Sequence, residues 1–239
     1  MMSEGIKEYI FRLIDDEVTR DELENWSYTA TGLEDLLGAK YIDLISLDYT
    51  SEGVVIEAKN LLSTHIDQGE YLDWHLRKNL NAILQRPENV HINIYHLYDL
   101  YCQGFEFLQA LALDFCIYIG YPAGKISVSS RLVWADLSAR QKDDLVNSLY
   151  PEIIEHAIRV IDCLNDGSIR IIGYLAENVG LEKTSLISDL EKENNTVPVV
   201  LENGQAVRVV PHVYKTFHYF QQFEYIDTRP DTLKKIMDC

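Results

Sequence analysis

The chain has 239 residues, of which 47% are apolar, so it can bury a substantial core as one large or two ordinary domains. Its formal charge of −17 repels nucleic acid and anionic membranes at long range and favours association with cationic partners. No apolar run approaches the ~20 residues of a membrane span, and the first residues lack a secretion signal. We therefore expect a cytoplasmic protein that binds neither nucleic acid nor membrane.

The acidic residues are concentrated early in the chain. Residues 1–120 hold 21 Asp and Glu against 8 Lys and Arg, whereas residues 121–239 hold 17 against 13. This excess either keeps the protein soluble or prepares one region for a basic partner. The four cysteines are widely spaced and no histidines have metal-ligand spacing, so we predict no disulfide framework, no metal and no cofactor.

The first elements are predicted to be helical. Apolar residues at helical spacing indicate a helix over residues 6–14 that ends near Asp15 and Asp16. Thr19 and Glu22 have the spacing of a capping box, which predicts a second helix through residue 30. A third helix is expected over residues 31–37, before Gly38.

A β-hairpin followed by a helix is the predicted centre of the first domain. Residues 41–47 and 54–58 are rich in β-branched residues, and residues 50–53 between them favour a turn. Helical spacing begins at Tyr71 and continues to residue 85, and residues 90–97 alternate like a half-buried strand. An apolar helix is expected over residues 105–119. Residues 1–122 therefore read as an α+β domain with helices around a small antiparallel sheet.

The second domain, residues 123–239, is predicted to be mostly helical with one β-hairpin. We expect a short strand at 126–128, a helix from Ser138 to residue 149, a helix from Pro151 to residue 166, and another over residues 181–190. Residues 169–175 fit either a strand or a helix. Residues 198–201 and 206–210 flank Asn203-Gly204, a strong hairpin signal. The aromatic tail, residues 212–226, is predicted to pack as a closing helix.

The acidic segment near the N-terminus carries the functional interpretation that we favour. Six acids occupy positions 15–24 against Arg20 alone. They fit a solvated turn, or a docking surface for a basic partner. The run EYIFRLIDDEVTRDELENW, residues 8–26, resembles the leading helices of immunity proteins that bacteria use against polymorphic toxins. The resemblance implies a non-enzymatic protein that masks a toxin, with no catalytic residues. The expected toxin-binding residues are Asp15, Asp16, Glu17, Asp21, Glu22, Glu24, Asp43 and Asp48.

A nuclease is the first alternative. Asp43 on one predicted strand and Glu57-Ala58-Lys59 on the next resemble the core of PD-(D/E)xK nucleases, in which the carboxylates hold Mg²⁺ and the lysine activates water. Glu34 would be an additional ligand. The acidity of the segment counts against this reading, because phosphate binding requires clustered Lys and Arg. Residues 40–115 also resemble small uncharacterised bacterial α+β proteins, which implies no chemistry.

A winged helix is the second alternative. Residues 170–210 could form a helix, a turn, a second helix and a hairpin, with the second helix in a major groove. That helix, residues 181–193, carries four acids and two lysines, which disfavours DNA binding but leaves protein contact open. No serine or histidine has the sequence context of a nucleophile. The oligomeric state is not indicated by the sequence.

Overall fold

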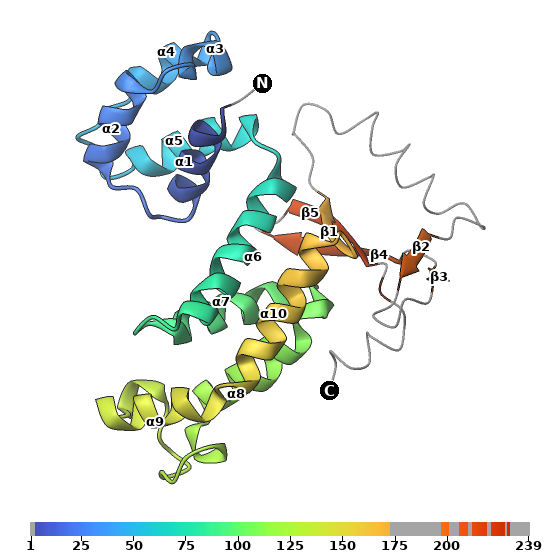
Figure 1. The fold of residues 1–239 in the computed structure, drawn as a ribbon. Coiled ribbons are helices and arrows are strands. Elements are labelled where there is room, and N and C mark those ends of the chain that lie inside the picture. Colours follow the sequence, from blue (N-terminus) through green and yellow to red (C-terminus); the bar gives the residue numbers. More distant parts are fainter. Residues whose placement is uncertain are drawn as a thin grey trace. The chain divides into compact units, whose positions relative to one another are not determined.

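The computed structural model describes residues 3–172, 197–200, 206–209, 212–218, 221–227 and 229. These residues are predominantly helical (Figure 1). The predicted α+β class with helices around an antiparallel sheet is therefore wrong. Residues 3–168 form helices and turns without any strand, and the strands described all follow residue 168.

The chain divides into two compact units. Residues 3–75 belong to unit 1, and residues 76–172 together with the described later strands belong to unit 2. The division falls between His75 and Leu76, inside the continuous helix α6 (Gln68–Gln85). The boundary predicted near residue 122 lies within unit 2.

Unit 1 begins with the three helices that the sequence predicts. They are α1 (Glu4–Ile14), α2 (Arg20–Thr29) and α3 (Leu33–Leu37). The capping box of α2 is confirmed: the Thr19 backbone N–H donates to Glu22 Oε2 at 2.8 Å, and the Glu22 N–H donates to Thr19 Oγ1 at 3.3 Å. The rings of Tyr9 and Trp26 stack with centroids 4.1 Å apart, which packs α1 against α2.

The predicted hairpin of residues 41–58 is wrong, because both segments are helices. They form α4 (Lys40–Ile45) and α5 (Val54–Leu62). On α5 the residues Val54, Ala58 and Leu62 are buried while Ile56 is 64% exposed. A strand would place Ile56 on the same face as Val54 and Ala58, whereas a helix turns it away from them. The predicted strand stopped at Ala58, and a window of five residues cannot distinguish a buried strand from a helix.

The core of unit 1 is built from one apolar stripe of each helix. Its fully buried members include Ile10, Leu13, Leu23, Leu33, Leu44, Leu62 and Leu72. Burying such side chains contributes roughly 1.5–3 kcal/mol each relative to exposure. A 3₁₀ turn, η1 (Ser63–His65), leads from α5 into α6.

Unit 2 continues with α7, whose residues were predicted to begin as a strand. The structure has α7 (Val90–Cys102) with Val90, Ile94, Leu97 and Leu100 buried, while Ile92 is exposed. The predicted alternation placed Val90, Ile92 and Ile94 on one face, so this strand is also wrong. The helical period becomes visible only when residues 97–100 are included.

The apolar segment that follows α7 is helical, as predicted, but irregular. It consists of the 3₁₀ turn η2 (Glu106–Leu108), the π-helical turn η3 (Ala110–Asp114) and α8 (Phe115–Gly120). Short 3₁₀ turns follow at η4 (Pro122–Gly124) and η5 (Trp134–Asp136). Residues 126–128, predicted as a strand, are bends, so that prediction is wrong.

Two predicted helices complete the helical part of unit 2. They are α9 (Ala139–Leu149), whose N-cap Ser138 accepts from the Gln141 N–H, and α10 (Glu152–Asn165). The later part of α6 packs with them. Arg77 donates from Nη2 to the Leu164 carbonyl at 3.0 Å, and the Tyr150 hydroxyl donates to the Ile83 carbonyl at 2.7 Å.

The described strands belong to two small antiparallel sheets. In one, β1 (Ile169–Ile172), β5 (Gln221–Asp227) and β4 (His212–His218) lie in the order β1-β5-β4. In the other, β2 (Val197–Val200) pairs with β3 (Ala206–Val209), in the segments predicted to flank Asn203-Gly204.

The closing helix predicted for residues 212–226 is wrong, because these residues contribute β4 and β5. Aromatic residues favour strands, and this preference outweighed the helical spacing of the phenylalanines. The turn Asn203-Gly204 and the helix predicted over residues 181–190 lie outside the described residues.

Candidate functional site

Unit 1 holds most of the negative charge of the chain. Residues 1–75 contain seventeen Asp and Glu and five Lys and Arg, a formal charge of −12 out of −17. Residues 76–172 contain eleven acids and nine bases, a formal charge of −2. The acidic character that the sequence assigns to the first half of the chain is thus a property of unit 1.

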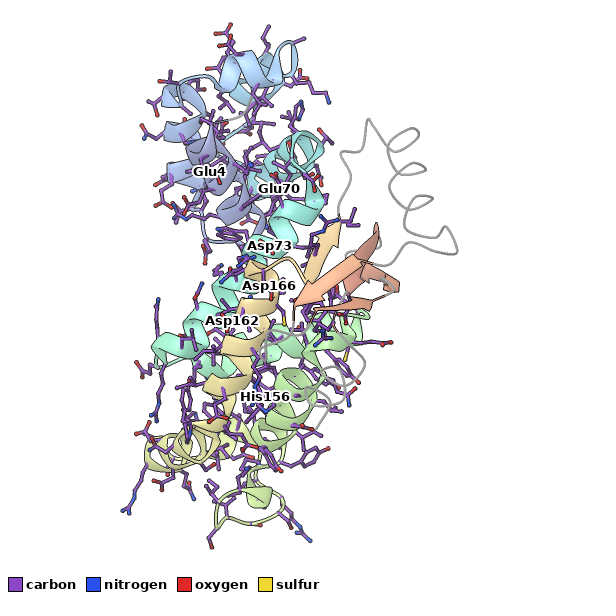
Figure 2. All side chains as sticks on the ribbon, turned by 45° about the vertical axis from the view of Figure 1, so that its right-hand side comes forward. Glu4, Glu70, Asp73, His156, Asp162 and Asp166 are labelled. Carbon is purple, nitrogen blue, oxygen red and sulfur yellow. The ribbon has the colours of Figure 1, made fainter. Side chains whose placement is uncertain are left out.

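Two lysines of unit 1 are held by its own carboxylates. Lys7 Nζ lies 2.7 Å from Glu70 Oε2 and 3.7 Å from Glu4 Oε2; Figure 2 labels both acids. The hydrogen bond that Lys7 donates to Glu70 raises the pKa of Lys7. Lys59 Nζ lies 2.6 Å from Asp16 Oδ1 and donates to the Ile14 carbonyl at 2.9 Å. These contacts join α6 and α5 to α1.

Two arginines of unit 1 also lie beside acids of the unit. Arg12 Nε is 3.9 Å from Glu17 Oε2, and Arg20 Nε is 3.9 Å from Asp21 Oδ1. Arg20 in addition donates from Nη1 to the Thr50 carbonyl at 3.2 Å. Four of the five Lys and Arg in residues 1–75 are therefore engaged within this part of the chain.

Asp15 differs from the other predicted toxin-binding residues because it is buried. Its side chain is 6% exposed and accepts from the Tyr71 hydroxyl at 2.6 Å. His75 Nδ1 lies 2.9 Å from both carboxylate oxygens. Asp15 thus fastens the C-terminal end of α1 to α6. The sequence did not predict a role for Tyr71 or His75 beside Asp15, since nothing local links them to a residue 56 or 60 positions earlier.

Glu22 and Asp48 are exposed and also serve local structure. The Glu22 carboxylate accepts from the Thr19 backbone N–H, which lowers the pKa of Glu22. The Asp48 carboxylate accepts from the Thr50 hydroxyl at 2.6 Å and from the Thr50 N–H at 3.0 Å, and these bonds lower the pKa of Asp48. Both groups therefore stay ionised at neutral pH.

The remaining predicted acids are exposed. Asp16 and Asp21 face the bases named above, whereas Glu24 and Asp43 make no ion pair within the described part of the chain. The same holds for four exposed acids that the toxin-binding prediction omitted, Glu34, Asp35, Glu52 and Glu57. The prediction omitted them because it concentrated on residues 15–24, where acids are most frequent in the sequence. The structure instead has exposed acids from α2 to α5.

Exposed apolar side chains accompany these acids. Tyr28 on α2, Ile42 on α4 and Ile56 on α5 are 55%, 64% and 64% exposed. The Tyr28 hydroxyl donates to the Ile45 carbonyl at 3.0 Å, and the Tyr41 hydroxyl donates to the Ser27 carbonyl at 3.2 Å. These two bonds join α2 to α4. Because residues 41–47 were predicted as a strand, the pairing of α2 with α4 was not expected. Tyr28 and Ile42 were therefore not proposed as functional residues.

A shallow hollow lies between the start of α2 and the start of α5. Its volume is about 370 Å³ and it is lined by Thr19, Arg20, Asp21, Ser51, Glu52, Val54 and Val55. The two carboxylates and one guanidinium at its edge give it a mixed polar rim. It lacks the enclosed apolar walls that are typical of small-molecule sites.

The strand framework required by the nuclease reading is not formed. Asp43 lies on α4, while Glu57 and Lys59 lie on α5, and Lys59 binds Asp16 and the Ile14 carbonyl. Among the residues described, no three His, Cys, Asp or Glu side chains are placed to hold a metal ion. The winged-helix reading depends on residues 173–196, which lie outside the description.

No helix in the described ranges combines the length and hydropathy needed to cross a bilayer. No family model, curated protein or solved structure matches the chain.

Proposed function

We propose that the protein is a non-enzymatic, cytoplasmic immunity protein that binds a basic bacterial toxin and neutralises it by contact. The observation that supports this proposal is the formal charge of −12 over residues 1–75, in which four of the five Lys and Arg are engaged by acids of the same segment. Exposed carboxylates without cationic neighbours keep their full attraction for an external cation.

The physical basis is electrostatic association. A field of one sign steers an oppositely charged protein and can raise association rates to about 10⁸–10⁹ M⁻¹s⁻¹ at low salt. Charge pairs that lose water at the interface can contribute roughly 1.5–7 kcal/mol of coupling. A toxin with a basic cleft would be blocked by such a partner without any chemical step.

The exposed members of the predicted set form the proposed contact surface. These are Asp16, Glu17, Asp21, Glu22, Glu24, Asp43 and Asp48, whose side chains reach solvent. Asp15 is excluded from the contact surface because its carboxylate is occupied inside unit 1. Removing Asp15 from the set leaves the proposed function unchanged.

The test is neutralisation of the protein encoded by the adjacent gene, in a host that expresses both proteins. We expect growth to be restored and the affinity of the purified pair to fall steeply as salt rises. The variant Asp21→Asn, Glu24→Gln, Asp43→Asn should lose about 100-fold or more in affinity.

The matched control removes three exposed acids of unit 2, with Asp143→Asn, Glu155→Gln and Asp162→Asn. It makes the same change in net charge, and we expect it to weaken binding by less than about threefold. Absence of growth rescue would contradict the proposed function. Equal losses in the two variants would contradict the assignment of binding to unit 1.

A further inference from the structure

We propose that the partner docks on the face of unit 1 formed by α2 and α4, with Tyr28 and Ile42 at its apolar centre. This inference rests on the proposed function, since it takes the partner to be a basic protein. It adds that the partner must present an apolar side chain within its basic surface. Charge alone would not distinguish this face from the other acidic parts of the surface of unit 1.

The two helices form one fixed surface. The Tyr28 hydroxyl binds the Ile45 carbonyl of α4 at 3.0 Å, and the Tyr41 hydroxyl of α4 binds the Ser27 carbonyl at 3.2 Å. The Tyr28 ring also lies 6.3 Å from the Tyr49 ring, centroid to centroid. Tyr28 is therefore held in place while more than half of it stays exposed. An ordered aromatic side chain loses little conformational entropy on binding.

Ile42 belongs to the same surface as Tyr28. It precedes Ile45 by three positions on α4, and residues three apart lie on one side of a helix. The Tyr28 hydroxyl binds the Ile45 backbone carbonyl, so it meets α4 about one helical turn beyond Ile42. The opposite side of α4 carries Leu44, which is fully buried. The geometry thus points to two large exposed apolar side chains, Tyr28 and Ile42, on the surface where α2 meets α4.

Carboxylates surround this apolar centre. On α2, Asp21 and Glu24 precede Tyr28 by seven and four positions, a spacing that keeps all three on one exposed stripe. On α4, the exposed Asp43 is one position after Ile42, about 100° further round the helix, and therefore lies at the edge of this face. An aromatic or aliphatic centre within a charged rim is the arrangement of protein-binding hot spots.

The charges decide which occupant fits. The acids Asp21, Glu24 and Asp43 would face like charges if a second copy of this chain docked on the same face, which is destabilising. A protein that brings Lys or Arg to the rim and an apolar side chain to Tyr28 and Ile42 satisfies both parts of the surface.

The test uses two synthetic basic peptides and requires no toxin. One repeats Lys-Leu-Ala-Lys-Leu-Ala-Lys twice, and the other has every leucine replaced by serine, so that the charge is the same. Backbone amide shifts of the ¹⁵N-labelled full-length protein locate the binding site. We expect the leucine peptide to shift residues 20–29 and 40–45 most strongly, and to bind at least about fivefold tighter than the serine peptide.

Two variants of matched chemistry complete the test. Ile42→Ser should weaken the leucine peptide about fivefold, whereas Ile158→Ser, at an exposed isoleucine of α10, should leave its affinity unchanged. Equal affinity for the two peptides, shifts centred on unit 2, or equal effects of the two variants would each overturn the docking surface. The peptides test the docking surface alone. Failure of the wild-type protein to neutralise the toxin would instead overturn the proposed function.

Discussion

Residues 3–75 and residues 76–172 are made of the same kinds of helix but distribute their charges differently. Both regions begin a helix with a capping box, Thr19 with Glu22 in one and Ser138 with Gln141 in the other. The formal charge is nevertheless −12 over residues 1–75 and −2 over residues 76–172. Helix formation and packing therefore do not require the acidic excess, which is a property of the surface of unit 1.

Cations link separate segments in both regions, with partly different partners. In unit 1, Lys7 and Lys59 bind carboxylates of neighbouring helices. In unit 2, Arg77 donates to the Leu164 carbonyl and to Asn165 Oδ1 at the C-terminal end of α10, where Figure 2 also shows Asp162 and Asp166. Arg86 binds Asn147 and lies over the Tyr150 ring. In unit 2 the arginines thus donate to neutral acceptors, lie over an aromatic ring and also form ion pairs.

The largest expected effects test whether the two regions are packed alike. Leu62→Ala on α5 and Leu97→Ala on α7 each remove a fully buried side chain, and each should lower the free energy of unfolding by about 2–5 kcal/mol in urea denaturation. Ile56→Ala and Ile92→Ala, on exposed positions of the same helices, should change it by less than about 1 kcal/mol. A loss at Ile56 as large as at Leu62 would contradict the helical face assigned to α5.

The next effect concerns the one buried carboxylate among the acids of the 15–24 segment. Asp15→Ala removes the buried carboxylate that accepts from the Tyr71 hydroxyl and contacts the His75 ring, so the free energy of unfolding should fall by roughly 2–3 kcal/mol. The neighbouring Asp16→Ala removes an exposed ion pair with Lys59 and should cost less than about 1 kcal/mol. Similar losses in the two variants would show that Asp15 is not the structural acid of unit 1.

A smaller loss of stability is expected when either capping box is removed. Thr19→Ala and Ser138→Ala each remove a side-chain acceptor for a backbone N–H of the first helical turn. Each should therefore destabilise the protein by about 1 kcal/mol. The measurement is the shift of the thermal midpoint by circular dichroism. A large loss in only one variant would mean that the two helices do not depend equally on their caps.

The smallest expected effect is a pH dependence of stability that only the capping box of α2 should show, because Glu22 is charged and Gln141 is not. The Thr19 backbone N–H lowers the pKa of Glu22 below 4.5, its ordinary value, so the folded state favours the carboxylate. The resulting stabilisation is complete above the ordinary pKa and is lost as pH falls through the lowered one. Glu22→Gln gives α2 the uncharged box of α9, so the stability advantage of wild type over this variant should shrink as pH falls below 4.5, the ordinary pKa of Glu22. An advantage that is constant with pH would exclude this role for the charge.

Local signals predicted much of the helical structure. The caps at Thr19 and Ser138, the proline before α10 and long amphipathic periods placed α1, α2, α6, α9 and α10 close to their observed positions. The failures at α4, α5 and α7 share a cause, because each predicted strand rested on a window of five to eight residues. Residues 212–226 failed because strand pairing depends on distant residues, here those of β1.

The sequence by itself determined the acidic character of unit 1 and the caps of its helices, because net charge and capping depend on composition and on neighbours within a few residues. Only the tertiary structure decided that Asp15 is buried against Tyr71 and His75 and that Tyr28 of α2, although exposed, binds the Ile45 carbonyl of α4. Burial and shared faces depend on which distant segments pack together, and no local pattern in the chain encodes that packing.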